Sequence, residues 1–459
     1  MEFKYLQKTP LYSALSDLGK RIFLPDGIFY WSGRAKKEAE IIGTIGSAFG
    51  FERDFVDGGG ADWMPCYLNE ISEYSNLGIK NIVPYASIGG LNETRELWKN
   101  WVLQKSQYNQ TKEKDLIQKL EKLITTPIIT AGVTNGIFQC SSLFLNPGEF
   151  IIAPNKRWGN YDNIIQKFIG AKIKSFTFFK DQNINLESLE HAINEVALVQ
   201  EKVIIILNFP NNPTGYVPSK EEGKEIVSLL QKQQRNHKKP IVVIVDDAYE
   251  PYVYNSDSIN RSIFYDLLQL EEDVIPIKLD GITKELLMYG GRIGFITLGL
   301  KSSWVENDQE LELLKSEIDN KLEGFTRATI SNCNHFYQAL TQKLFKEKGI
   351  DKILTSRSKV KELLKKRYEK INSELAKIND PNISIDPNSG GFFLFLNLNP
   401  DKIKANEFGD HLLKKYKVGI IPIEKLDEQI NGIRIAYCSV DLPKIPELIK
   451  RIKLALNDF

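Results

Sequence analysis

The chain has 459 residues, 42% of them hydrophobic and 26% charged, so it can bury a substantial core and form more than one domain. Its 60 Lys and Arg residues nearly balance 59 Asp and Glu residues, which excludes a strong overall field for nucleic acid or an anionic membrane. Four dispersed cysteines and four histidines show no disulfide or metal-ligand spacing, so we expect no metal site and a reducing, cytoplasmic compartment.

Residues 1–75 are dense in glycine and aromatic residues, as in GIFYWSG and VDGGGADW. This composition is typical of loops, which either fold over a ligand or simply pack on the body. The N-terminus lacks the apolar core and cleavage site of a signal peptide. No apolar run approaches the ~18 residues of a membrane helix, so we expect no membrane partner.

The next stretch, from Asn81, predicts a loop containing Tyr85, followed by an amphipathic helix with Leu97, Trp98 and Trp101 on its apolar side. After a charged helix at 112–123, the segment ITAGVTNG indicates a strand end, a turn and a helix start. The free N–H groups of such a helix start, with a threonine hydroxyl beside them, suit a phosphate. Ordinary turns before helices look the same, so this pattern is weak by itself.

Runs rich in Ile and Val then follow, separated from one another by predicted helices. Within each run, apolar and polar residues hardly alternate. These runs are Glu149–Ala153, Val203–Leu207, Ile241–Val245, Val274–Leu279 and Ile293–Leu298. Strands of this kind are covered on both faces, and the intervening helices imply a mostly parallel α/β sheet. Ligands bind at the carboxyl ends of such strands. Asn212, Asp246 and Lys284 each follow one of these ends.

Lys284 lies in a turn, and Arg292 follows eight residues later in a Gly-Gly-Arg-x-Gly-Phe sequence. An amine that forms a Schiff base must be held in place and partly desolvated, and an arginine nearby can bind a phosphate with its planar donors. A solvated surface lysine is the ordinary alternative for this pattern taken alone.

Beyond Lys301 the chain is predicted to be mainly helical, and it ends in short strands and helices that form a second, α+β lobe. The lysine-rich helix at 354–377 and the basic stretch at 231–240 are expected to be solvated faces. We expect no nucleic-acid partner.

The segment NFPNNPTG at 208–215 resembles the Asn-Pro-Thr-Gly motif of the class I/II, fold type I aminotransferases that depend on pyridoxal 5'-phosphate. Further segments similar to this family follow in order. They are DDAY at 246–249, Lys284 with Arg292, and NGIRI at 431–435. The resemblance covers residues 40–450, and the combination is specific although each motif alone is not.

The resemblance implies a fold type I α/β architecture, with a large domain whose mostly parallel sheet is sandwiched by helices and a smaller α+β domain. We predict a large domain at 81–335 and a C-terminal small domain at 336–459. Residues 1–80 form an N-terminal segment and part of the small domain. A homodimer is implied as well.

In this family pattern Lys284 forms the Schiff base and moves the substrate proton, and Asp246 pairs with the pyridine nitrogen. Asn212 and Tyr249 contact the phenolic oxygen, and Trp158 stacks on the ring. Without the resemblance, Asp246 is a helix cap or surface acid, Asn212 a turn residue and Trp158 a core residue.

The resemblance also assigns the phosphate to Val133, Thr134 and Arg292, with Tyr85 reaching in from a neighbouring subunit. Gly281 stands where the family has a serine or threonine that contacts the phosphate. That contact is therefore lost or supplied by Thr283.

For the substrate, Arg434 corresponds to the arginine that binds the α-carboxylate. Gly46 corresponds to a loop that closes on the substrate. Arg327, in TRATISN, corresponds to an arginine that binds a distal carboxylate across the dimer in aspartate aminotransferases, although relatives with other substrates have it too. Ser331 and Asn332 match a Ser-Asn-Pro-Pro run, but the two prolines are missing.

The leading hypothesis is an aminotransferase that moves an amino group from aspartate, an aromatic or a related amino acid to a 2-oxo acid. A β-lyase or decarboxylase with the same cofactor is the alternative. A non-enzymatic regulator with an aminotransferase-like domain is disfavoured, because nothing before residue 80 resembles a DNA-binding helix-turn-helix.

Overall fold

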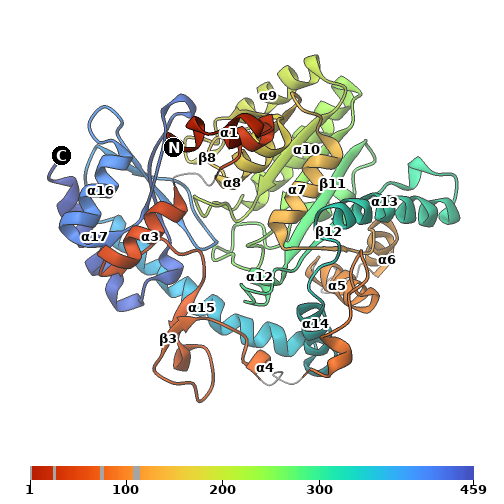
Figure 1. The fold of residues 1–459 in the computed structure, drawn as a ribbon, viewed down its shortest axis with the longest axis horizontal. Helices are drawn as coiled ribbons and strands as arrows, with labels where there is room; N and C mark the ends of the chain where they lie inside the picture. The colour runs from red at the N-terminus through yellow and green to blue at the C-terminus, as the bar shows by residue number, and fades with distance from the viewer. Residues whose placement is uncertain (1–2, 24–26, 73–76, 107–113) are drawn as a thin grey trace.

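A seven-stranded sheet forms the centre of the protein in a computed structural model that describes residues 3–23, 27–72, 77–106 and 114–459 (Figure 1). Its strand order is β4-β12-β11-β10-β9-β5-β6. The bounds are β4 Ile128–Thr130, β12 Gly294–Leu298, β11 Val274–Gly281, β10 Ile241–Asp246, β9 Val203–Asn208, β5 Phe150–Pro154 and β6 Lys172–Phe176. β12 is antiparallel to both of its neighbours, and the other neighbouring pairs are parallel. The predicted strands and the mostly parallel α/β sheet are confirmed.

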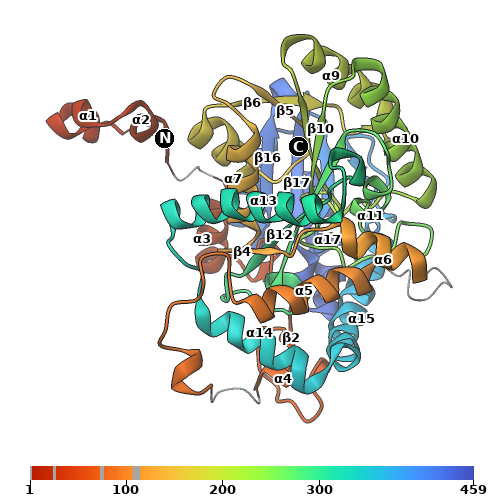
Figure 2. The same ribbon diagram turned by 90° about the vertical axis from the view of Figure 1, so that its right-hand side faces the viewer.

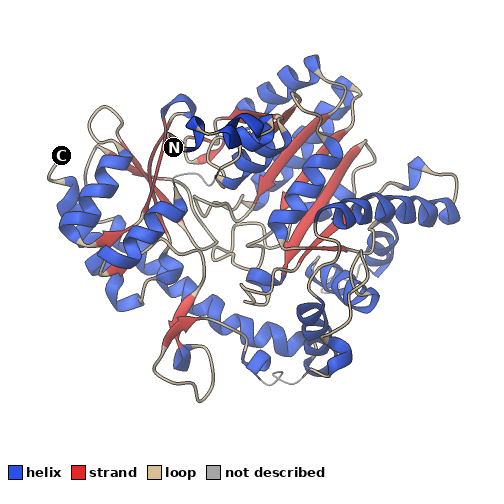
Figure 3. Ribbon diagram, in the orientation of Figure 1, coloured by secondary structure: helices blue, strands red, loops and turns tan. Residues whose placement is uncertain are grey.

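The sheet is covered on both faces, which explains its continuous apolar strands (Figure 3). Every residue of β9 and β10 is buried. Helix α7 (Val133–Phe144) packs on β10, β11 and β12. It lies on one side of the sheet, with α9 (Leu186–Val199) and α10 (Lys220–His237) on the other (Figure 2). A capping box formed by Ser219 and Glu222 starts α10.

A second, four-stranded antiparallel sheet lies in the C-terminal part, in the order β13-β14-β17-β16. Its bounds are β13 Ile383–Ile385, β14 Leu394–Leu398, β17 Ile430–Ile435 and β16 Ile421–Lys425. Helix α16 (Ala405–Tyr416) packs on β16 and β17, and α17 (Ile445–Leu456) packs against both α16 and α15 (Ile350–Leu375). The short strand β1 (Ile41–Ile42) pairs with β15 (Val418–Gly419), so the N-terminal segment joins this lobe. The domain boundaries at 80 and 335 stay a prediction.

The expectation of loops throughout residues 1–75 is wrong. The structure has α1 (Pro10–Ala14), α2 (Asp17–Arg21), α3 (Ile28–Glu38) and α4 (Asn69–Ser72), while residues 24–26 and 73–76 lie outside the described ranges. GIFYWSG starts α3, which buries Trp31 and Ala35. Trp31 packs with Leu413 and Ile421. A helix forms here because its apolar side chains are buried against the distant lobe. Local composition cannot reveal this burial.

The predicted aromatic helix is α5 (Asn92–Lys105), in which Trp98 and Trp101 are buried as expected. The charged helix is described from Lys114 as α6 (Lys114–Leu123), because residues 107–113 lie outside the described part. Further elements are β2 Phe49–Phe51, β3 Trp63–Pro65, α8 Asn160–Asp162, β7 Phe179–Lys180, β8 Asn183–Ile184, α11 Phe264–Leu268, α12 Ile282–Glu285, α13 Asp308–Thr329 and α14 His335–Lys348. Among the described residues, no helix has the length and apolar character needed to cross a membrane.

Candidate active site

A cavity of about 270 Å³ opens at the carboxyl ends of β9, β10 and β11. Its lining contains ten of the residues that the sequence singled out, from both sheets and from the N-terminal segment. They are Gly46, Val133, Thr134, Trp158, Asn212, Asp246, Tyr249, Lys284, Arg292 and Arg434. Residues from positions 46 to 434 therefore meet in one place.

Lys284 lies on α12, directly after β11. Its Nζ donates a hydrogen bond to the carbonyl oxygen of Gly46 at 3.0 Å and lies 5.7 Å from the ring centre of Tyr249. Burial, together with the positive charges of Arg292 and Arg434, lowers the pKa of Lys284 to about 8. About a tenth of this amine is therefore neutral, and so nucleophilic, at pH 7, far more than of an ordinary lysine.

Asp246 is the last residue of β10, and its side chain is buried. Its carboxylate accepts hydrogen bonds from Tyr161 Oη at 2.5 Å and from the Ala248 N–H at 3.2 Å. Burial raises the pKa of Asp246 to about 6, although both hydrogen bonds act in the opposite direction. Such a carboxylate strongly favours a cation beside it.

Sequence reasoning missed Tyr161. It lies three residues after Trp158, and the two rings meet edge to face with their centres 5.7 Å apart. Trp158 precedes α8, so the two aromatic residues share no helix face and their spacing gave no signal for Tyr161. The contact of Tyr161 with Asp246 spans 85 residues and is visible only in the fold.

Asn208 was missed as well, and it holds the Asn-Pro-Thr-Gly turn against the end of β10. Its side-chain NH₂ donates to the carbonyl oxygen of Asp246 at 2.8 Å, and its Oδ1 accepts from the Asn212 N–H at 2.8 Å. The side chain of Asn212 is thereby directed toward the cavity, where its Oδ1 accepts a bond from Arg434.

Arg434 lies on β17 and is buried, which excludes a surface arginine. Its guanidinium donates to Asn212 Oδ1 at 3.2 Å and to the carbonyl oxygen of Thr44 at 3.1 Å, and it lies 4.4 Å from the ring centre of Phe393. Burial lowers its pKa to about 10. In the described part of the chain no carboxylate is among the groups that act on its charge, and its Nε has no hydrogen-bond partner. A buried, unpaired guanidinium is suited to a carboxylate ligand.

The start of α7 and Arg292 also line the cavity. Gly132, the N-cap of α7, has φ +81°, and a Cβ there would lie 2.4 Å from Arg292 Nη2. The glycine therefore allows the guanidinium to approach the helix start. The first N–H groups of a helix have no intrahelical acceptor, so this part of the lining combines two features that bind phosphate.

Gly281 departs from the family pattern for a steric reason. A Cβ at this position would lie 2.6 Å from the carbonyl oxygen of Ile293 and 2.9 Å from Gly294 Cα. A serine or threonine does not fit this backbone. Thr283 lines the cavity instead.

Tyr85 and Arg327 do not line the cavity of their own chain. Tyr85 is 90% exposed, and Arg327 is exposed with its guanidinium bonded to Ser331 Oγ at 2.5 Å. Both were predicted to act across a dimer, so these two assignments stay predictions. Ile28 and Phe393, which the sequence did not indicate, give the cavity apolar walls.

The polar groups that line the cavity match those of pyridoxal 5'-phosphate. A buried amine with a lowered pKa is present for the aldehyde, a buried carboxylate for the ring nitrogen, and a helix start with an arginine for the phosphate. The half-buried Trp158 lines the same cavity.

Comparison with known proteins agrees with this geometry. The model of the family "Aminotransferase class I and II" matches residues 98–452. The aspartate aminotransferase of Pyrococcus horikoshii is 24% identical over 339 residues, covering 72% of this chain and 75% of the relative. A probable aspartate/prephenate aminotransferase of Aquifex aeolicus is 24% identical over 383 residues, covering 82% and 84%.

Two solved structures show the same fold. An aminotransferase from Anaerococcus prevotii superposes with a TM-score of 0.77 at 24% identity, covering 95% of this chain and 98% of that one. The kynurenine aminotransferase of Pyrococcus horikoshii gives 0.74 at 18% identity, covering 98% of both. The chain belongs to the class I and II aminotransferases. It is a fold type I enzyme that depends on pyridoxal 5'-phosphate and transfers amino groups between amino acids and 2-oxo acids.

Proposed function

We propose that this aminotransferase carries out its reaction in the cavity around Lys284, with aspartate, an aromatic or a related amino acid as donor. The observation that carries the proposal is the meeting of a low-pKa amine, a buried carboxylate and an unpaired buried arginine in one cavity. When bound, the cofactor supplies an aldehyde that accepts the amino group and a ring that accepts electrons. The chain's own residues position the reactants and move protons.

Lys284 is the proposed general base and acid. In the first half-reaction its Nζ removes the proton from the Cα of the amino acid. In the second, it delivers a proton to the Cα of the 2-oxo acid. Its lowered pKa, about 8, keeps enough neutral amine for the first step and enough ammonium for the second.

Asp246 is the proposed partner of the ring nitrogen. Because its pKa is raised to about 6 by burial, a cation at this position relieves the cost of its buried charge. Tyr161 keeps the carboxylate oriented through its 2.5 Å hydrogen bond. Asn212 and Tyr249 are the proposed partners of the phenolic oxygen, and Trp158 is the proposed stacking partner of the ring.

Arg434 is the proposed ligand of the substrate α-carboxylate. Its guanidinium is held in place by Asn212 and Thr44, so a carboxylate bound to it has a fixed orientation. Val133, Thr134 and Arg292 are proposed to hold the phosphate, so that the cofactor and the substrate each have a fixed anionic group in the cavity that contains Lys284.

The donor side chain is proposed to lie against Ile28, Phe393 and the loop at Gly46. These apolar walls favour an aromatic side chain within a single chain. A dicarboxylic donor requires a cation from elsewhere, and Arg327 of a second subunit is the proposed source. The names of two relatives, the aspartate aminotransferase of Pyrococcus horikoshii and the aromatic-amino-acid aminotransferase 2 of Thermococcus litoralis, support the dicarboxylic and the aromatic donor class.

A homodimer is proposed because apolar side chains are exposed in the segment that contains Tyr85. Ile79, Val83 and Tyr85 are 76%, 74% and 90% exposed, and contiguous apolar exposure of this kind marks an interface. Tyr85 is proposed to reach the phosphate of the partner. A cytoplasmic location is proposed because the four cysteines are all free and buried.

The experiment that tests the function uses purified protein loaded with pyridoxal phosphate. ¹⁵N-labelled aspartate, tyrosine, phenylalanine and kynurenine are supplied in turn with 2-oxoglutarate, and transfer of ¹⁵N to glutamate is followed. We expect transfer from at least one donor, and loss of transfer in Lys284→Ala. The control is Lys301→Met, because Lys301 is a buried lysine that binds the carbonyl oxygens at the end of α11. Release of ammonia and pyruvate without transfer would point to a lyase instead.

A further inference from the structure

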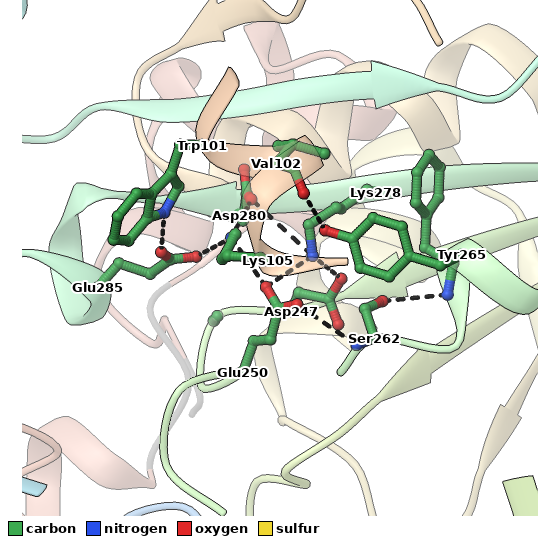
Figure 4. Close-up of polar contacts among 12 residues, drawn as sticks. Trp101, Val102, Lys105, Asp247, Glu250, Ser262, Tyr265, Lys278, Asp280 and Glu285 are labelled. Carbon is green, nitrogen blue, oxygen red and sulfur yellow. Dashed lines mark hydrogen bonds and ion pairs between the residues drawn. The ribbon is translucent and has the colours of Figure 1, made fainter. Parts of the chain in front are cut away.

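A network of buried charges lies on the face of the sheet turned away from α7, and Figure 4 shows its polar contacts. Leu279 of β11 faces α7, close to Gly136. Its neighbours in the strand face the other way because side chains alternate along a strand. The members come from α5, β11, α12 and the turn after β10. They are Lys105, Lys278, Asp280, Glu285, Asp247 and Glu250.

Lys105 is the central cation of this network. Its Nζ binds Glu250 Oε2 and Asp280 Oδ2, both at 2.8 Å, and Glu285 Oε1. Carboxylate oxygens of these three acids lie within 4.8 Å of one another, a spacing that could hold a metal ion. The lysine ammonium occupies that position, so a residue of α5 supplies the positive charge that a bound cation would supply.

Lys278 binds Asp247 Oδ2 and, at 2.8 Å, the same Glu250 Oε2 that binds Lys105. Glu250 thereby joins the two lysines. The indole N–H groups of Trp98 and Trp101 donate to Asp280 at 2.8 Å and to Glu285 at 2.5 Å. These bonds satisfy the carboxylates further, as a buried charge requires.

Two members of the network are adjacent in sequence to the principal active-site residues. Asp247 follows Asp246, and Glu285 follows Lys284. Asp246 and Lys284 line the cavity, whereas Asp247 and Glu285 do not and are held in the network. Each active-site residue therefore has an anchored neighbour, and both anchors connect to α5 through Lys105.

We propose that Lys105 is a positioning residue for the aminotransferase reaction, which fixes the segments carrying Asp246 and Lys284 relative to each other through Glu250, Asp280 and Glu285. The inference rests on the roles proposed above for those two residues. Apolar contacts could bury the same surface, but charge-assisted hydrogen bonds also fix direction and register. Misplacement of reacting groups by about 1 Å can cost about 100-fold in rate.

The test compares Lys105→Met with Lys301→Met, in which a largely buried and a buried lysine are replaced by a neutral side chain of similar length. Thermal unfolding and circular dichroism first establish that each variant folds. We then expect kcat of Lys105→Met to fall about 100-fold, with KM for the donor changing less than about threefold. Lys301→Met is expected to keep kcat. Equal losses in the two variants, or an unchanged kcat in Lys105→Met, would overturn the proposal.

A second readout uses the apoprotein and does not depend on turnover. Acetylation of Lys284 is measured by peptide mass spectrometry as a function of pH. The midpoint is expected at about 8 in the wild type. It is expected to be higher in Lys105→Met, because a displaced Lys284 is more solvated. The groups that face Lys284 are Tyr249, Tyr289, Cys438, Arg292 and Arg434, and all are unchanged in this variant.

If Lys105→Met fails to fold, Glu285→Gln provides the same test, because it keeps the size of the side chain and weakens only one contact of Lys105. A lower kcat and a raised Lys284 midpoint support the proposal, and wild-type values of both overturn it. Failure of the proposed function has a different signature. The wild-type protein would then transfer no amino group, whereas the labelling midpoint of Lys284 would still respond to Lys105.

Discussion

Replacing Asp246 by asparagine is expected to stabilise the apoprotein while it weakens cofactor binding. The carboxylate is fully enclosed, and its pKa rises from 3.8 to about 6 on folding. At about 1.36 kcal/mol for each pKa unit, this difference corresponds to a cost of about 3 kcal/mol when the group is ionised in both states. Asparagine carries no charge and avoids this cost.

The net gain is smaller, because the asparagine NH₂ cannot accept one of the two bonds from Tyr161 and Ala248. One lost hydrogen bond costs about 1 kcal/mol. The free energy of unfolding of Asp246→Asn at about pH 8 should therefore exceed that of the wild-type apoprotein by about 2 kcal/mol.

The pH dependence gives the sign of the effect. A group whose pKa is raised in the folded state favours folding fully below its unfolded pKa, here 3.8, and this contribution is lost as the pH rises through about 6. The cost of the charge falls from about 3 kcal/mol at pH 8 to about 1.5 kcal/mol at pH 5. The advantage of the asparagine variant should shrink accordingly.

Urea unfolding of the apoproteins at both pH values measures these differences, with the exposed Asp257→Asn as the control. With pyridoxal phosphate bound, the wild type should be more stable than the variant, because the variant lacks the anion that pairs with the ring nitrogen. The Kd of the variant for pyridoxal phosphate should rise at least about 100-fold. An apoprotein variant that is less stable than the wild type at pH 8 would refute the argument that this carboxylate is buried at a cost.

Three further outcomes are expected. Capture of pyridoxal phosphate by the apoprotein should accelerate as the pH rises through about 8, the pKa of Lys284, because the neutral amine is the attacking form; a flat stopped-flow profile would contradict this. Arg434→Gln should raise KM for amino-acid donors about 100-fold by removing a charge-assisted pair, but it should leave amine donors without a carboxylate unaffected, and equal losses for both would exclude the assigned role. Tyr161→Phe should raise the pKa of Asp246 further, since the phenol stabilises the ionised form. The midpoint of the pH dependence of cofactor affinity should then move upward, and an unchanged midpoint would show that the phenol has no such effect.

The sequence by itself determined the family, the mostly parallel sheet and most of the cavity lining. It could do so because these features depend on short motifs and on strand ends. Apolar runs without polar alternation indicate buried parallel strands, and the carboxyl ends of parallel strands meet at one edge. Asn212, Asp246 and Lys284 could therefore be placed together without any long-range information.

Only the tertiary structure decided which residues support that lining. Tyr161 reaches Asp246 across 85 residues, and Lys105 reaches Glu285 across 180. Neither pair has a periodic or local signal, because the partners come from different elements that are brought together by packing. The helix at 28–38 likewise depends on packing between distant elements, since a partner near residue 413 buries it.

Gly281 illustrates the same limit at a single position. The sequence indicated a missing hydroxyl, but the reason is the close approach of β12, whose entry at Ile293 leaves no room for a Cβ. Local sequence determines where chemistry is possible along the chain. The packing of distant elements determines the burial, the charge balance and the space that give each of these groups its reactivity.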